Sequence, residues 1–126
     1  MLGDAAEAVV AARLVALGWI LLGRRVRAGR GELDLVLIDP GPPPALAVVE
    51  VRWRASRAFG LPEETVGRSK RAHLRTAVAR LLDAGRLPDG TRLPHLPIRV
   101  DLVAVEPART PGEAPTIRHH RAVLGR

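Results

Sequence analysis

The sequence has 126 residues, 47% of them hydrophobic, and no cysteine, which suffices for one domain with a buried core and excludes a disulfide scaffold or a zinc site built from cysteines. Its 20 lysine and arginine residues outnumber the 13 acidic residues and give a net charge of +7, which is typical of nucleic-acid-binding proteins, although a GC-rich genome also produces an arginine-rich composition. No apolar run reaches the roughly 18 residues of a membrane span, and the N-terminus lacks the layout of a signal peptide. We therefore expect a cytoplasmic protein without a membrane partner, folded as a single domain over residues 1–126.

The first predicted element is an alanine-rich helix over residues 5–17, with Asp4 as its N-cap and Gly18 at its end. The apolar positions at helical spacing are Val10, Leu14 and Leu17. Glu7 falls on the same stripe, so its carboxylate would face whatever the helix packs against. The alternative is that Glu7 only interacts favourably with the helix dipole from the first turn.

Three β-strands are predicted next, over residues 19–26, 32–38 and 45–53. The glycine-containing segment 28–31 forms a turn between the first two strands, and the proline-rich segment 39–44 forms a turn between the second and third. The second and third strands are apolar on both faces, which is typical of strands that are covered on both sides.

The second half of the chain predicts one helix and two strands. A loop over 56–62 leads into a helix that begins between Glu63 and Ser69 and ends at Asp83 before Gly85. Its apolar positions are Leu74, Val78, Leu81 and Leu82. Strands follow at 98–105 and, at a sheet edge, 116–124. The order α-β-β-β-α-β-β predicts a mixed sheet with one helix on each face or both on one.

Adjacent histidines lie in the last predicted strand. Because neighbouring residues of a strand point to opposite faces, His119 and His120 make a poor joint metal site, and we interpret both as surface residues.

Two short runs place carboxylates inside the predicted buried strands, Gly31 to Asp34 and Glu50 to Arg52. Side chains two residues apart share a face of a strand, roughly 6.5 Å apart, so Glu50 and Arg52 point the same way. If the hairpin register suits, Asp34 and Glu50 meet on one face. A buried carboxylate is costly without a cation, so the pair predicts a site for a hard divalent ion. The alternative is a structural ion pair between Glu50 and an arginine.

At these residues the sequence resembles the YraN-like family of small bacterial proteins, which is similar to the PD-(D/E)xK nuclease superfamily and to archaeal Holliday-junction resolvases. The matching motifs are Glu7 in the first helix, Gly31-Glu32-Leu33-Asp34-Leu35-Val36, Val49-Glu50-Val51-Arg52 followed by Arg54, Phe59-Gly60, Lys70 with Leu74, and Asp101-Leu102-Val103-Ala104-Val105. The resemblance implies a restriction-endonuclease-like α/β fold, an endonuclease activity that needs Mg²⁺ or Mn²⁺, and, as in the resolvases, a possible homodimer.

The resemblance also implies roles for individual residues. Asp34 and Glu50 would ligate the metal, Glu7 would assist from the helix as a third ligand, and Arg52 would lie beside the phosphate as the third catalytic residue. Arg52 stands where the family has a lysine; it keeps the positive charge but cannot act as a base. Lys70, the only lysine, could reach the site from the second helix.

The leading functional hypothesis is a magnesium-dependent endonuclease that acts on DNA, with branched or flapped DNA as candidate substrates. The arginine at position 52 favours a second hypothesis, a non-catalytic nucleic-acid-binding module that keeps the nuclease fold; a structural or partner-binding protein is the third. The expected phosphate contacts are Arg24, Arg25, Arg27, Arg54, Arg57 and Lys70. Only three aromatic residues are present, which argues against a single-strand reader built on base stacking.

Overall fold

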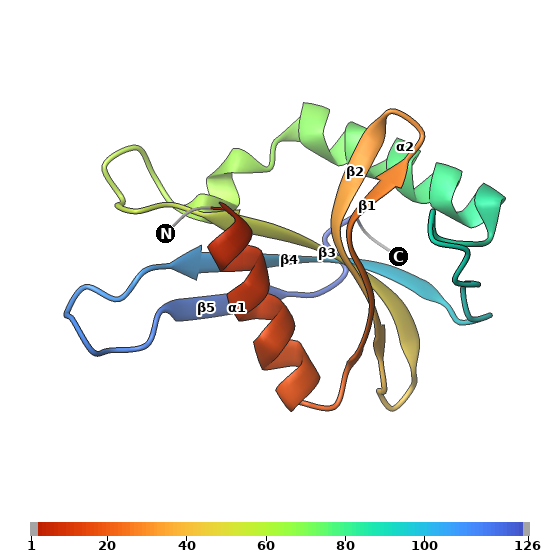
Figure 1. The fold of residues 1–126 in the computed structure, drawn as a ribbon. Coiled ribbons are helices and arrows are strands. Elements are labelled where there is room, and N and C mark those ends of the chain that lie inside the picture. Colours follow the sequence, from red (N-terminus) through yellow and green to blue (C-terminus); the bar gives the residue numbers. More distant parts are fainter. Residues whose placement is uncertain (1–2, 125–126) are drawn as a thin grey trace.

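The computed structural model describes residues 3–124, which form one five-stranded sheet with a helix on each face (Figure 1). The elements are α1 (Gly3–Ala16), β1 (Ile20–Ala28), β2 (Gly31–Asp39), β3 (Ala45–Trp53), the short 3₁₀ helix η1 (Pro62–Thr65), α2 (Arg68–Ala84), β4 (Ile98–Glu106) and β5 (Thr116–His120). The strands are ordered β1-β2-β3-β4-β5; β3 and β4 are parallel and the other neighbours are antiparallel. The predicted mixed α/β fold and the element order are therefore confirmed.

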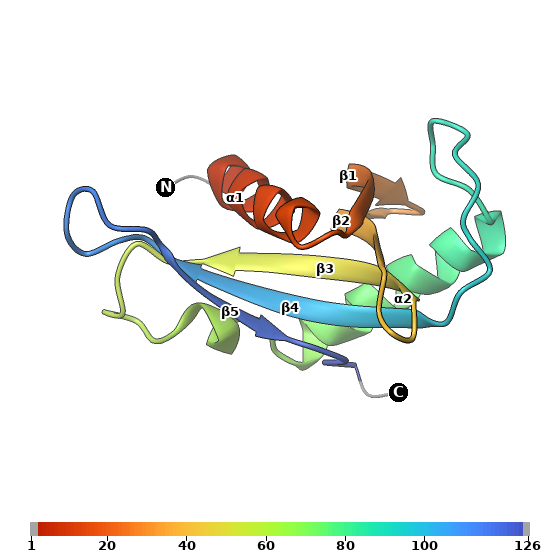
Figure 2. The same ribbon diagram turned by 90° about the horizontal axis from the view of Figure 1, so that it is seen from below.

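The two helices cover opposite faces of the sheet, since each packs in a separate apolar cluster; Figure 2 shows α1 above β3 and α2 passing behind the strands. On one face, Val10 and Leu14 of α1 pack in a cluster with alternate residues of the central strands, Leu35, Leu37, Val49, Val103 and Val105. On the other face, Leu74, Ala77 and Leu81 of α2 pack in a cluster with Val36, Leu46 and Val48. Alternation of side chains across the strands produces these two layers, which explains why β2 and β3 are apolar at nearly every position.

Some boundaries and burial assignments differ from the sequence predictions. Helix α1 begins at Gly3, so Asp4 lies in its first turn and not at the N-cap, and its carboxylate pairs with Arg25. Leu17 follows the end of the helix and is 65% exposed. Leu82 is 46% exposed because it lies one residue beyond the buried Leu81, on the flank of α2. The edge strand β5 ends at His120.

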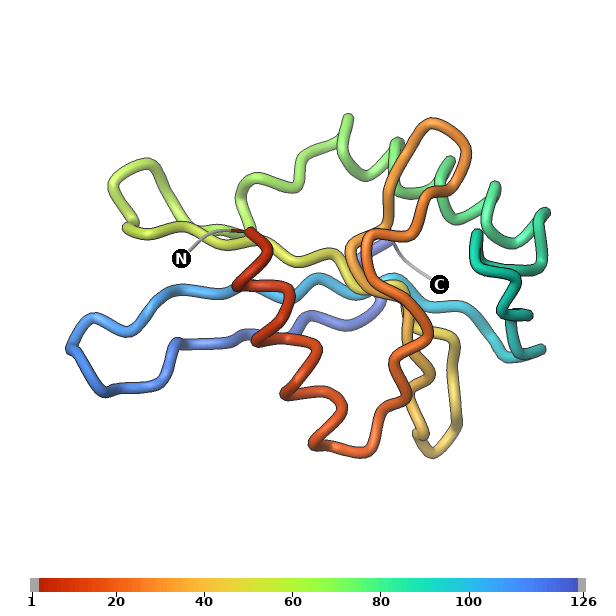
Figure 3. Tube along the Cα trace, viewed as in Figure 1, coloured from red at the N-terminus to blue at the C-terminus, as the bar shows by residue number. Residues whose placement is uncertain are grey.

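The hairpin of β1 and β2 extends beyond the sheet as a two-stranded arm. Pairing of β2 with β3 runs from Asp39 opposite Ala45 to Leu35 opposite Val49, whereas pairing of β2 with β1 continues to Gly31. Residues of the arm, among them Val26, Ala28 and Leu33, belong to the same apolar cluster as α2. Figure 3 shows the arm rising from the sheet to lie beside the helix. Asp34 therefore lies where β2 leaves β3.

Within the described residues 3–124, no helix is long and apolar enough to cross a membrane.

Candidate active site

A cavity of about 490 Å³ lies where β2 leaves β3, and four elements contribute its polar walls. The charged residues that line it are Glu7 of α1, Asp34 of β2, Glu50 and Arg52 of β3, Arg54 just after β3, and Lys70 of α2. The structure thus brings together the three predicted metal ligands and three of the predicted cations around one space.

Asp34 is fixed by a backbone hydrogen bond across the gap between the two strands. The N–H of Val51 donates to Oδ2 of Asp34 at 2.8 Å. At this point β2 and β3 have stopped pairing, so the carboxylate serves as the acceptor for the Val51 N–H. The bond holds the Asp34 carboxylate beside the residue that precedes Val51, which is Glu50.

Glu50 is 3% exposed, and among residues 3–124 one of its oxygens contacts two cations while the other has no hydrogen-bond partner. Its Oε2 lies 2.9 Å from Nη2 of Arg52 and 3.4 Å from Nζ of Lys70. Its Oε1 is buried and accepts no hydrogen bond from any of residues 3–124. Burial raises the pKa of Glu50, the charge of Asp34 raises it further, and so does the hydrogen bond that only a protonated Glu50 can donate to Asp34; Lys70 and Arg52 oppose this only in part, so the pKa is about 7. The ionised pair is therefore short of positive charge.

Glu7 completes the acidic wall from α1 without joining the carboxylate pair. Its side chain is 12% exposed, and Oε1 lies 3.5 Å from Nε of Arg25. Burial raises the pKa of Glu7, and the negative charge of Asp34 raises it further. However, across the described part of the chain no three acidic or histidine side chains form a group that could hold a metal ion. The predicted set of three ligands is thus present around the cavity but is not assembled.

The carboxylate oxygens of Asp34 and Glu50, which do lie together, are suitable ligands for a hard divalent cation. Mg²⁺ is commonly bound by one or two carboxylates, with substrate phosphate and water as the remaining ligands. Asp34 and Glu50 supply such a pair, and the partnerless Oε1 of Glu50 is an oxygen that a cation would satisfy.

The residues expected to contact phosphate differ in whether a carboxylate of the protein already pairs with them. Arg57 donates two hydrogen bonds to Glu106, at 2.7 and 2.9 Å, and Arg25 pairs with Asp4 and Glu7. The remaining four are Arg24, which reaches the Asp4 carbonyl oxygen at 3.5 Å, the exposed Arg27, Arg54 with a buried Nε that has no partner in residues 3–124, and Lys70 beside Glu50. The charges of Arg25 and Arg57 are thus already balanced by internal carboxylates.

A second buried carboxylate, Asp101 of β4, is fully engaged and lies outside this cavity. It accepts hydrogen bonds from Nε and Nη2 of Arg99 at 2.8 and 2.9 Å and from the Ala122 N–H at 3.1 Å, and it lies 2.8 Å from Nε2 of His119. Burial alone would raise the pKa of Asp101, but the bonds from His119, Arg99 and Ala122 outweigh it and lower the pKa to about 2. This motif residue therefore ties the end of the chain to the sheet.

The histidines do point to opposite faces, as predicted, because His120 lies 3.0 Å from Glu63 while His119 contacts Asp101. The interpretation of His119 as a surface residue is wrong in one respect: its side chain is only 23% exposed, since the hydrogen bond to Asp101 holds it against the sheet. The sequence did contain an indication of this contact. Asp101 lies in a predicted apolar strand, and a buried carboxylate needs hydrogen-bonding or ion-pair partners.

The fold and the site together define a small α/β protein in which a buried glutamate, Glu50, lies beside the half-buried Asp34 and two cations. Residues 6–105 match the family described as Uncharacterised protein family UPF0102, and the chain belongs to this family, which confirms the family resemblance of the motifs.

Similar chains come from several bacteria. The UPF0102 protein of Bordetella petrii is 40% identical over 108 residues, covering 85% of this chain and 64% of that protein. The UPF0102 protein of Saccharophagus degradans is 37% identical over 103 residues, covering 82% and 80%, and that of Symbiobacterium thermophilum is 38% identical over 105 residues, covering 83% and 81%. The chain spans less than two thirds of the length of the Bordetella petrii relative.

Proposed function

We propose that this protein is a metal-dependent endonuclease acting on DNA, with the restriction-endonuclease-like architecture of the PD-(D/E)xK superfamily. The observation that carries the proposal is the state of Glu50. It is buried in contact with Asp34, one of its oxygens faces two cations, and the other has no hydrogen-bond partner within residues 3–124. A purely structural ion pair would be expected to satisfy both oxygens.

Each residue of the cavity has a role in this proposal. Asp34 and Glu50 hold one Mg²⁺ or Mn²⁺. When bound, the metal supplies charge stabilisation at the phosphate and lowers the pKa of a water molecule. Lys70, a compact ammonium with three donors, orients the attacking water or neutralises developing charge, and the planar guanidinium of Arg52 binds a phosphate oxygen. Glu7 assists from α1 as a further acidic group in the wall.

One observation favours the second candidate, a non-catalytic nucleic-acid-binding module. Arg52 lies 2.9 Å from Oε2 of Glu50, so this guanidinium competes with a metal for the carboxylate. Lys70 favours the first candidate, because it places a compact ammonium 3.4 Å from the same oxygen.

The test is a cleavage assay on duplex, flap and four-way-junction DNA with Mg²⁺ and with Mn²⁺. The parent is compared with Asp34→Asn, Glu50→Gln and the control Glu113→Gln, which makes the same chemical change at an exposed residue that does not line the cavity. Cleavage by the parent and the control but by neither site variant supports a nuclease. Binding without any cleavage overturns the nuclease in favour of the binding module, and the absence of both overturns both candidates.

A further inference from the structure

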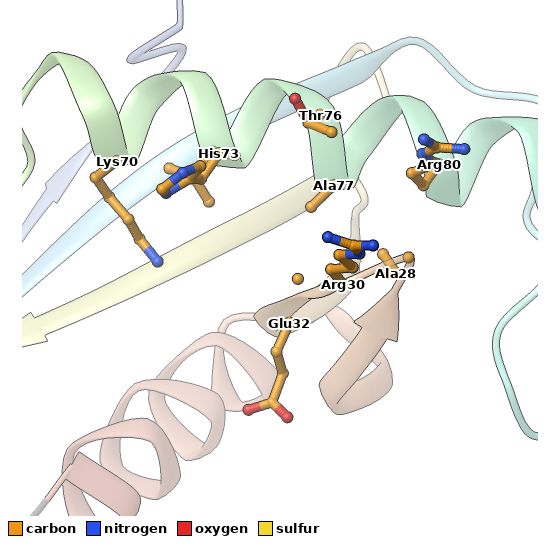
Figure 4. Close-up of a pocket in the computed structure, with 11 residues that line it drawn as sticks. Ala28, Arg30, Glu32, Lys70, His73, Thr76, Ala77 and Arg80 are labelled. Carbon is orange, nitrogen blue, oxygen red and sulfur yellow. The ribbon is translucent and has the colours of Figure 1, made fainter.

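A larger cavity, of about 680 Å³, lies between the tip of the β1–β2 arm and α2. Figure 4 shows its two walls: Lys70, His73, Thr76 and Arg80 project from α2, while Arg30 and Glu32 come from the arm. Lys70 lines both this groove and the candidate active site, so the two spaces adjoin at that side chain.

The cations of the groove are not neutralised by the protein. Within residues 3–124, Arg30 and Arg80 form no ion pair, in contrast to Arg25 and Arg57. The carboxylate of Glu32 points away from α2 in Figure 4 and leaves the opposing basic wall free. The groove therefore has an uncompensated positive charge that an anionic ligand would balance.

The floor of the groove is narrow and lacks flat side chains. A Cβ atom at Gly31 would lie 3.2 Å from Cβ of Ala77, so the glycine lets the arm approach the helix closely. At the far end, the side chain of Arg80 lies across Gly29, whose φ of +63° suits the turn. No Phe, Tyr or Trp lines the groove, so it offers no large aromatic platform for base stacking, and its cations favour contacts to the phosphate backbone.

We propose that this groove binds the sugar–phosphate backbone of the DNA strand that enters the active site. Lys70 lies where the groove meets the acidic pair, His73 follows one turn along α2, and Arg30 and Arg80 contact phosphates farther from the site. This inference rests on the proposed function, because it takes its ligand from there. It adds Arg30, His73 and Arg80 to the residues that hold the substrate.

The test is DNA binding by fluorescence anisotropy in EDTA, where cleavage cannot occur. The double variant Arg30→Ala/Arg80→Ala is compared with Arg13→Ala/Arg75→Ala, which removes the same charge from exposed helical positions outside the groove. If two phosphate contacts are lost, affinity at low salt should fall roughly tenfold or more, and the slope of log K against log salt should fall by about two. For the control variant, the slope of log K against log salt should differ from that of the parent by less than about one, which corresponds to one phosphate contact.

A second pair of variants tests the groove without removing an arginine. Thr76→Glu adds a carboxylate to the wall at an exposed position of α2, and Thr76→Gln adds the same bulk without charge. If Thr76→Glu binds DNA more weakly than the parent and Thr76→Gln does not, the groove inference is supported. This comparison decides for or against the groove if the double variant fails to fold. If the parent binds but both groove variants match their controls, the groove inference is overturned and the proposed function stands. If the parent binds no DNA in EDTA and neither binds nor cleaves it with Mg²⁺ or Mn²⁺, the DNA ligand itself is wrong and both are overturned.

Discussion

Nζ of Lys70 on α2 lies 3.4 Å from Oε2 of Glu50 on β3. The only lysine of the chain thus reaches the carboxylate pair from a helix, whereas Arg52 reaches it from the strand that carries Glu50. Two cations meet one carboxylate oxygen, and they differ in shape and in how they would act on a phosphate.

Replacing Lys70 by methionine, which keeps the length and removes the charge, should lower the cleavage rate by roughly 100-fold at saturating DNA, as expected when one preorganised electrostatic group is lost. Lys70→Arg should restore binding more than rate, because the fork of an arginine cannot reproduce a compact ammonium. Single-turnover cleavage and anisotropy separate the two effects. A methionine variant with the rate of the parent would exclude Lys70 from the chemistry.

The variant Arg52→Lys should cleave faster than the parent, whose own activity we expect to be weak. The guanidinium lies 2.9 Å from Oε2 of Glu50 and holds in place the carboxylate that a metal would bind through Oε1, and an error of about 1 Å in reacting geometry costs roughly 100-fold in rate. Parent and variant are assayed side by side on the three DNA substrates. Brisk cleavage by the parent with no gain in the variant would show that arginine serves equally well.

Binding of Mn²⁺ should depend on Asp34 and only partly on Glu7. Asp34→Asn keeps an acceptor for the Val51 N–H, so the local fold is retained while the charge is lost, and calorimetry should detect no Mn²⁺ binding. Glu7→Gln should weaken binding by about tenfold, as for a residue that supports a ligand without being one. Equal losses in the two variants would mean that Glu7 moves in to bind the ion directly.

Glu50→Gln should be more stable than the parent at pH 8 without metal, and the difference should shrink at pH 5. The raised pKa of about 7 means that between pH 4.5 and 7 the folded state keeps a proton that the unfolded state has released. The free energy of unfolding of the parent therefore falls by up to about 3 kcal/mol as the pH rises through this range. Above this range it no longer changes with the ionisation of Glu50. Urea denaturation at both pH values measures this. A variant that is less stable than the parent at pH 8 would show that the ionised Glu50 is well compensated.

Asp101→Asn should cost about 3 kcal/mol at pH 7, because it leaves Arg99 with less compensation in a buried network. The pKa of Asp101 is lowered to about 2, so the stabilisation is present above the ordinary pKa of 3.8 and is lost as the pH falls from there toward 2. The difference between parent and variant in urea denaturation should narrow over that range. The exposed Asp83→Asn is the control and should change stability by less than about 0.5 kcal/mol.

Much of the fold could be predicted because burial on both faces leaves a strong pattern. Strand β3 runs from Ala45 to Trp53 as predicted, and Gly85 ends α2 in the left-handed conformation with φ of 68°. The exposed Leu17 and Leu82 show the limit of this signal: apolar spacing identifies a helix face but not the residue at which packing ends.

The site was harder to predict than the fold. Residue spacing indicated that Asp34 and Glu50 could meet, but not that β2 leaves β3 at that residue, which creates the space between them. The approach of Lys70 depends on the path of α2 across the sheet, and the network around Asp101 depends on where the last strand ends. These are tertiary relations between distant segments, and no local propensity encodes them.

The arm of β1 and β2 has no β3 neighbour before Leu35, so its position is held by packing on α2, by the Asp34–Val51 hydrogen bond and by the ion pairs of Arg25 with α1. An outward movement of the arm would carry Asp34 away from Val51 and the arm away from α2, so it would lengthen that hydrogen bond and widen the groove together. If the acidic pair binds a metal and the groove binds a strand, a ligand that favours the closed arm at either place would favour it at the other, and by thermodynamic reciprocity metal and strand would raise each other's affinity by the same factor.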